Sequence, residues 1–207
     1  TLIDDSFGSI VSAVKWGRSL YRNIQRFIFF QLVVNVTALL LVLGGSFIGT
    51  ELPLTITQML WVNLIMDTFA AMALASLPPE SDVMRKKPRK QTDFIINRTI
   101  GWAISIVGLL FFGLMFALLW YFERVAGVSP RELTIFFTIF VMLQWWNLLN
   151  AKTLGGCRTA FHRLMADKGL LLVLAIILVG QWVIVEFGGK MFRTTPLDLE
   201  TWIWIII

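Results

Sequence analysis

The sequence predicts an all-α membrane protein, a bundle of six transmembrane helices. Three observations lead to this fold class. The chain is 57% hydrophobic with a mean hydropathy of +0.76, which excludes an ordinary soluble domain. Its apolar residues fall into six runs, and all but the last are long enough to cross a bilayer. Lys and Arg gather in alternate connections between the runs, as the positive-inside rule requires.

The spans are expected at residues about 27–48, 57–77, 100–122, 133–150, 169–187 and 197–207, the last of them truncated. The segment before the first span and the second and fourth loops hold four, six and four basic residues, whereas the other loops hold none, two and two. This asymmetry places the N-terminus in the cytosol. The formal charge of +5 therefore reflects topology, so we expect the lipid bilayer, and no nucleic acid, as a partner.

The first helix is predicted to be much longer than a span. No proline occurs from Ser6 to Gly44, a distance of about 58 Å along an unbroken helix. Asp4 and Asp5 precede Ser6 in the pattern of a helix start. We assign residues 1–26 to a cytosolic stalk and residues 27–207 to the membrane domain. One face of the stalk carries four basic residues, which suit both a positive-inside flank and a rigid link to a soluble domain: Lys15, Arg18, Arg22 and Arg26.

The two ends of the sequence look cut. The chain opens without an initiator Met and closes inside the apolar run TWIWIII, so we expect a piece of a longer protein. Cys157 is the single cysteine, which excludes an internal disulfide. Cys157 and His162 both fall in a loop assigned to the cytosol, where we expect neither to form a site.

Asp67 is the acidic residue that lies deep within a predicted span. It sits roughly 15 Å from either end of the second span, near the bilayer midplane. An ionised Asp at that depth costs about 3 kcal/mol on insertion scales, so such residues are functional candidates by default. The alternative is a protonated Asp hydrogen-bonded inside the bundle. Pro78 and Pro79 are expected to end this helix at the membrane edge.

Three amides accompany this carboxylate as candidate ligands. Asn63 lies four residues before Asp67, on the same helix face. Asn35 has a comparable depth in the preceding span, with interhelical hydrogen bonding as its alternative role. Gln144 in the fourth span is a further candidate for which structural and functional roles weigh equally. Thr37 and Thr68 are expected to bond carbonyls of their own helices.

Carboxylate and amide oxygens without nearby thiolate or imidazole suit a hard cation such as calcium. Calcium takes about six to eight oxygens, and these residues offer too few of them. One carboxylate also leaves one charge of a divalent ion uncompensated. We therefore expect backbone carbonyls and an acidic residue elsewhere in the protein to complete the site.

The residues also resemble a known family. The sixth transmembrane helix of P-type calcium ATPases, particularly of the plasma-membrane group, is similar to VNLIMDTFAAMALASLPPE. The end of the phosphorylation domain and the fifth helix resemble LIDDSFGSIVSAVKWGRSLYRNIQRFIFFQLVVNV, and the eighth helix resembles QWWNLLNAK. The resemblance covers essentially the whole chain and implies helices five to ten of that fold.

The resemblance implies ATP-driven calcium export from the cytosol, with ATP and Mg²⁺ bound in cytosolic domains absent from this sequence. By position, Asn63 and Asp67 match calcium ligands and Asn35 matches the fifth-helix asparagine. Ala38 and Gln144 stand where the sarcoplasmic-reticulum pumps carry glutamates, which implies one calcium per cycle. The resemblance also implies a multi-pass plasma-membrane location and partners in the missing N-terminal helices and cytosolic domains.

Two other functions stay open on the sequence. One is a P-type pump for another cation, such as sodium, protons or manganese. The other is a secondary transporter or channel with an acidic site in the membrane, against which the long basic stalk argues. A membrane scaffold without transport leaves the Asn63 and Asp67 pair unexplained.

Overall fold

The structure, a computed structural model, describes residues 6–49, 54–80, 82–85, 94–155, 159–161 and 164–206. Over these ranges the chain forms helices and turns without strands, which confirms the all-α prediction. The predictions for Asp4, Asp5, Cys157 and His162 lie outside the described residues. Within them, five helical segments are long and apolar enough to cross a membrane: Phe7–Ile48, Ile56–Ala75, Arg98–Val125, Pro130–Thr153 and Lys168–Phe187.

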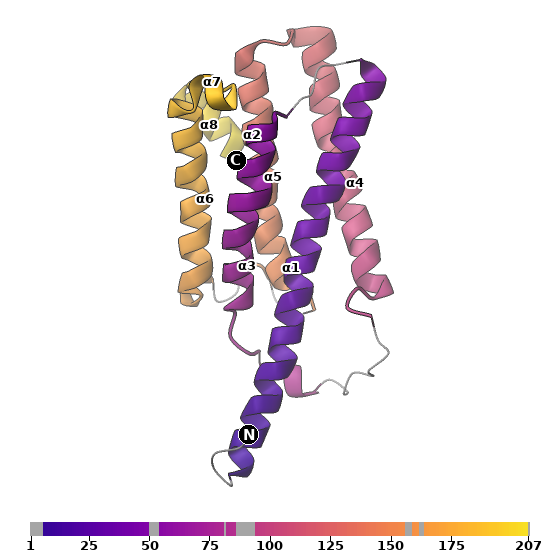
Figure 1. The fold of residues 1–207 in the computed structure, drawn as a ribbon, viewed down its shortest axis with the longest axis vertical. Coiled ribbons are helices and arrows are strands. Elements are labelled where there is room, and N and C mark those ends of the chain that lie inside the picture. The colour runs from indigo at the N-terminus through magenta and orange to yellow at the C-terminus, as the bar shows by residue number, and fades with distance from the viewer. Residues whose placement is uncertain are drawn as a thin grey trace.

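Helix α1 (Phe7–Ile48) is unbroken over 42 residues, as the absence of proline predicts. It begins after Ser6 and ends at Gly49, whose φ of 77° is the left-handed conformation that glycine adopts without strain. Its N-terminal part projects beyond the other helices in Figure 1. We call this end of the bundle the stalk end. The opposite end, where the short helix α7 (Gly189–Phe192) turns the chain from α6 back to α8, is called the hairpin end.

The second membrane segment is composite. It consists of α2 (Ile56–Leu60), the π-helical turn η1 (Trp61–Met66) and α3 (Asp67–Ala75). Thr55 caps its start, because its hydroxyl accepts from the amide of Gln58 while the Gln58 side chain accepts from the amide of Thr55. The helix ends at Ala75, two residues earlier than predicted and before the two prolines.

The remaining elements complete the bundle, and a short hairpin closes one end of it (Figure 1). They are η2 (Val83–Arg85), α4 (Arg98–Tyr121), η3 (Phe122–Ala126), α5 (Pro130–Thr153), η4 (Leu164–Ala166), α6 (Lys168–Phe187), α7 (Gly189–Phe192) and α8 (Leu199–Ile206). The predicted sixth span begins as the eight-residue α8. The division at residue 26 and the numbering of the helices within a larger fold stay predictions.

Helix α1 packs against α3, α4 and α5, and α6 packs against α3 and α5. Glycines allow two of the closest approaches. A Cβ on Gly108 of α4 would lie 3.1 Å from the Val36 side chain of α1, and one on Gly180 of α6 would lie 2.4 Å from the Trp61 ring. The core at these contacts contains large side chains without solvent exposure: Phe30, Leu41, Met66, Phe136, Phe137 and Phe140.

Candidate cation site

Asp67 lies at the start of α3, in the interior of the composite segment, and is 5% exposed. Neither of its carboxylate oxygens has a hydrogen-bond partner among the described residues. Buried polar groups in native proteins are nearly always paired, because an unpaired one loses its water without replacement. A partnerless carboxylate inside a membrane helix is therefore the strongest sign of a ligand site in this chain.

The helix that carries Asp67 is not the regular α-helix that the sequence predicts. In η1 the backbone bonds run five residues back, and the amide of Asp67 donates to the carbonyl of Val62. Asn63 lies within this turn and is exposed on the surface of the described chain. The Thr68 hydroxyl donates to the Leu64 carbonyl at 2.5 Å, which confirms the prediction for that threonine.

Asn35 and Gln144 lie on other helices and differ in environment. Asn35 is on α1 at an exposed position. Gln144 of α5 is fully buried, and neither atom of its amide head has a partner among the described residues. One turn further along, the Asn147 amide donates to the carbonyl of Phe30 at 3.4 Å, while its own oxygen has no partner. Asn147 is thus a buried polar residue for which the sequence alone predicts no role.

The structure joins none of the four candidate residues to another by a hydrogen bond among the residues it describes. Asn63 and Asp67 share one helical segment, whereas Asn35 lies on α1 and Gln144 on α5. Within the same described residues, no group of three or more His, Cys, Asp or Glu side chains could hold a metal ion. The assignment of these residues as ligands stays a prediction, and so does the expected shortage of acidic ligands in this part of the protein.

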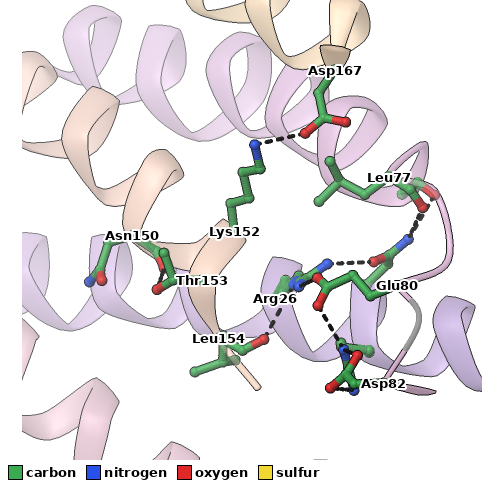
Figure 2. Close-up of polar contacts among 12 residues, drawn as sticks. Arg26, Leu77, Glu80, Asp82, Asn150, Lys152, Thr153, Leu154 and Asp167 are labelled. Atoms are coloured by element: carbon green, nitrogen blue, oxygen red, sulfur yellow. Dashed lines mark hydrogen bonds and ion pairs between the residues drawn. The ribbon is translucent and has the colours of Figure 1, made fainter. Parts of the chain in front are cut away.

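A second polar cluster lies toward the stalk end, where α1 meets the chain that leaves α3 (Figure 2). Arg26 of α1 is 2% exposed, and its guanidinium uses all three nitrogens. Nη2 forms an ion pair with Oε1 of Glu80, Nη1 donates to Oδ1 of Asn23 at 3.2 Å, and Nε donates to the Leu154 carbonyl at 3.3 Å. Arg26 thereby connects α1 to the segments that follow α3 and α5. We call this group, with Arg22 and Asp82, the arginine junction.

Arg22 extends the arginine junction by one helical turn. Its Nη1 lies 3.2 Å from Oε2 of Glu80 and 2.9 Å from Oδ1 of Asp82, and its Nη2 donates to Oδ2 of Asp82 at 3.1 Å. The bond to Asp82 is therefore bidentate, the most directional form of a guanidinium–carboxylate pair. Arg18, another turn away, donates to the carbonyl of Val83 at 3.3 Å.

Asn23 caps the helix that carries Asp67. Its amide nitrogen donates to the carbonyls of Ala75 and Leu77 at 3.2 and 2.9 Å. These carbonyls belong to the C-terminal end of α3 and its exit, where helix carbonyls lack amide partners. The cap comes from α1, so the position of the two helices relative to each other is fixed by directional bonds at this point.

A buried ion pair joins α5 to the start of α6. Nζ of Lys152 lies 2.7 Å from Oδ2 of Asp167, and both side chains are about one-tenth exposed (Figure 2). In the sequence, Lys152 and the stalk arginines appear only as topological charges, without predicted partners. For the stalk arginines, the signal that could have found the pairs is the group of acidic residues in PPESD directly after the helix of Asp67.

Comparison with known proteins supplies the family. Residues 51–207 match the family described as cation transporting ATPase, C-terminus. The chain is 39% identical over 216 residues to plasma membrane calcium-transporting ATPase 2 of Oreochromis mossambicus, covering 99% of this chain and 19% of that protein. It is also 39% identical to plasma membrane calcium-transporting ATPase 4 of Bos taurus and 3 of Homo sapiens, again over 99% of this chain and 18% of each relative.

The chain therefore spans about one-fifth of the length of the curated relatives that it matches. The matched region includes the segment of Asp67, the arginine junction's acidic partners and every helix from α2 to α8. With its apolar helices and this match over most of its length, the chain belongs to the cation-transporting ATPase family, as a multi-pass membrane region from the C-terminal part.

Proposed function

We propose that this chain is the C-terminal membrane region of a P-type ATPase that exports calcium from the cytosol across the plasma membrane. The observation that carries the proposal is the buried carboxylate of Asp67, whose two oxygens have no partner among the described residues. The names of the relatives described above, each a plasma membrane calcium-transporting ATPase, supply the cation. In this proposal ATP and Mg²⁺ bind in cytosolic domains elsewhere in the protein.

Asp67 and Asn63 are the proposed ligands from the second membrane segment, and Asn35 is the proposed ligand from α1. All three offer oxygen, the donor that calcium prefers. Gln144 is a further proposed ligand, supported by the absence of a partner for its amide oxygen. A carboxylate from outside the described residues is required as well, because Asp67 alone compensates half of the charge of a calcium ion.

The proposed pump moves one calcium ion in each cycle. Ala38 is buried in α1 and cannot bind an ion, and Gln144 is neutral. A second divalent ion would need additional negative charge in the membrane, where uncompensated charge costs several kcal/mol. With Asp67 as the acidic residue at depth, the chemistry favours a single site.

We further propose that α1 carries motion between the cytosolic domains and the cation site. The helix is continuous from the stalk to the membrane, and the arginine junction and Asn23 hold it to the end of α3. A displacement of α1 would therefore move the helix of Asp67 through charged and neutral hydrogen bonds as well as through packing.

The test is Asp67→Asn in the full-length pump. This change keeps the shape of the side chain and removes its charge, so calcium-dependent phosphorylation from ATP should be abolished. Glu186→Gln is the matched control, since Glu186 lies near the hairpin end of α6, and it should behave as the wild type. Phosphorylation from inorganic phosphate without calcium checks folding. Repeating the wild-type assay with manganese, sodium or protons in place of calcium tests which cation the pump transports. Normal calcium-dependent phosphorylation in Asp67→Asn would refute the ligand role.

A further inference from the structure

The helix of Asp67 changes its hydrogen-bond spacing at the residue itself. Over η1 the bonds run five residues back, ending with the amide of Asp67 on the carbonyl of Val62. From Asp67 to Ala75 the chain is an α-helix, whose bonds run four residues back. The amide of Asp67 bonds to the carbonyl five residues back, and with α-helical spacing the next amide, that of Thr68, bonds to the carbonyl four residues back, which is that of Leu64. One carbonyl between these two acceptors is therefore left without a backbone donor. The skipped carbonyl is that of Asn63.

The position of this carbonyl follows from helix geometry. Helix carbonyls point toward the C-terminus, so the main-chain oxygen of Asn63 points along the axis toward the turn of Asp67. The side chain of Asp67 leans toward the N-terminus, back onto the preceding turn. The two groups therefore approach the same space from opposite directions. Asn63 is exposed on the surface of the described chain, whereas both carboxylate oxygens of Asp67 are buried within it.

The residues of η1 do not force this irregularity. Trp61–Met66 contains neither glycine nor proline, the usual causes of a break in a helix. The second π-helical turn, η3, differs because it ends a helix just before Gly127, whose φ is 82°. The interruption in η1 is internal and flanked by α-helix on both sides. Such internal π-turns occur frequently at functional sites, where local strain is retained for a role in function.

We propose that the main-chain carbonyl of Asn63 is a ligand of the transported cation, beside the carboxylate of Asp67. This inference rests on the proposed function and adds an atom to its site. A backbone carbonyl is a neutral oxygen donor of the kind that hard cations take in proteins, so it raises the coordination number, while the missing negative charge still has to come from a carboxylate elsewhere. Asn63 then supplies two oxygens, one from its side chain and one from its backbone, which reduces the shortage of ligands noted in the sequence.

The test weakens this single carbonyl in the full-length pump. Replacing Leu64 by its α-hydroxy analogue through nonsense suppression converts the bond between residues 63 and 64 into an ester, whose carbonyl is a poorer donor. The same replacement at Leu60 is the matched control, because Leu60 and Leu64 are both exposed leucines of one segment and each ester removes one amide. The readouts are the calcium dependence of phosphorylation from ATP and, as a folding check, phosphorylation from inorganic phosphate.

The ester at Leu64 should raise the calcium concentration for half-maximal phosphorylation about threefold or more, while the ester at Leu60 leaves it near the wild-type value. Equal effects of the two esters, or no effect of either, would overturn the ligand assignment for this carbonyl. Asp67→Asn, assayed in parallel, separates the two proposals. If it abolishes calcium-dependent phosphorylation while the Leu64 ester changes nothing, the cation site stands and the carbonyl ligand falls. If it changes nothing, both proposals fall.

Discussion

Arg26 and Glu80 are 54 positions apart in the sequence, and their ion pair joins α1 to the chain that leaves the helix of Asp67. The Arg26 side chain is 3% exposed and that of Glu80 is 35% exposed. Because the guanidinium is buried, its charge depends on this carboxylate and on the neutral acceptors around it. The pair therefore holds α1 to the exit of α3 at the stalk end, and its loss should cost more than the loss of an exposed surface pair.

Glu80→Gln should lower the free energy of unfolding by about 2 kcal/mol. Breaking a fully buried ion pair costs about 3–5 kcal/mol, and the cost is smaller here because Glu80 is partly exposed. The change leaves Arg26 buried without its anionic partner and keeps nearly the same shape. The midpoint temperature for unfolding of the purified full-length protein in detergent should fall. Asp198→Asn is the control: Asp198 pairs with Arg131 at 3.2 Å with both side chains at least half exposed, so its removal should change little. Equal midpoints for the two variants would contradict a special role for the buried pair.

Asn23→Asp separates the cap on α3 from the rest of the junction. Aspartate keeps an oxygen that can accept from Arg26, but it has no amide to donate to the carbonyls of Ala75 and Leu77. Two carbonyls would lose their partner and meet a carboxylate oxygen, at a cost of about 1–3 kcal/mol.

Hydrogen exchange measured on the peptide that contains Leu74 to Leu77 should rise in Asn23→Asp, because the end of α3 opens more often. A peptide from α4 serves as the internal reference. Unchanged exchange at the end of α3 would show that this cap does not hold the helix.

The sequence predicted the membrane helices well because bilayer thickness and charge bias leave strong signals. Long apolar runs located the segments, and the absence of proline predicted the length of α1. Asp67 was found for the same reason, since a carboxylate stands out in an apolar run. Its burial and lack of a partner among the described residues, which support its assignment as a ligand, came from the structure.

Two features were not predicted, and each has a physical reason. The π-turn η1 contains no helix-breaking residue, so nothing in Trp61–Met66 distinguishes it from a regular helix. The arginine junction was missed because Arg22 and Arg26 look the same in sequence whether they are solvated flank or buried partners. Their acids, Glu80 and Asp82, lie more than 50 positions away, and sequence periodicity carries no information on such pairing.

Gly180→Ala should destabilise the contact between α6 and the segment of Asp67. The added methyl would lie 2.4 Å from the Trp61 ring, so the indole has to move, at a cost of about 1–3 kcal/mol. Gly113→Ala in α4 is the control, because its methyl would have nothing within 4 Å. Replacing glycine by alanine inside a helix is otherwise favourable by about 0.5–1 kcal/mol. The thermal midpoint should therefore fall for Gly180→Ala and stay or rise for Gly113→Ala.

Trp61→Phe tests whether the indole causes that loss. Phenylalanine lacks the outer ring that meets Gly180, so Gly180→Ala should cost less in the Trp61→Phe background than in the wild type. A double-mutant cycle on thermal midpoints measures the difference. Strict additivity of the two changes would place the strain somewhere other than the Trp61 contact.

Ala38→Glu combined with Gln144→Glu should allow the full-length pump to bind and transport a second calcium ion in each cycle. Ala38 is 4% exposed in α1 and Gln144 is fully buried in α5, so the two new carboxylates would lie inside the helix bundle. Two charges there need a divalent ion to offset them, since each unpaired one costs about 3 kcal/mol. The ratio of calcium transported to ATP hydrolysed, measured in reconstituted vesicles, should rise from near one toward two. Ala38→Gln with native Gln144 adds bulk without charge and should keep the ratio near one. An unchanged ratio in the double glutamate variant, with transport intact, would mean that missing charge does not set the stoichiometry.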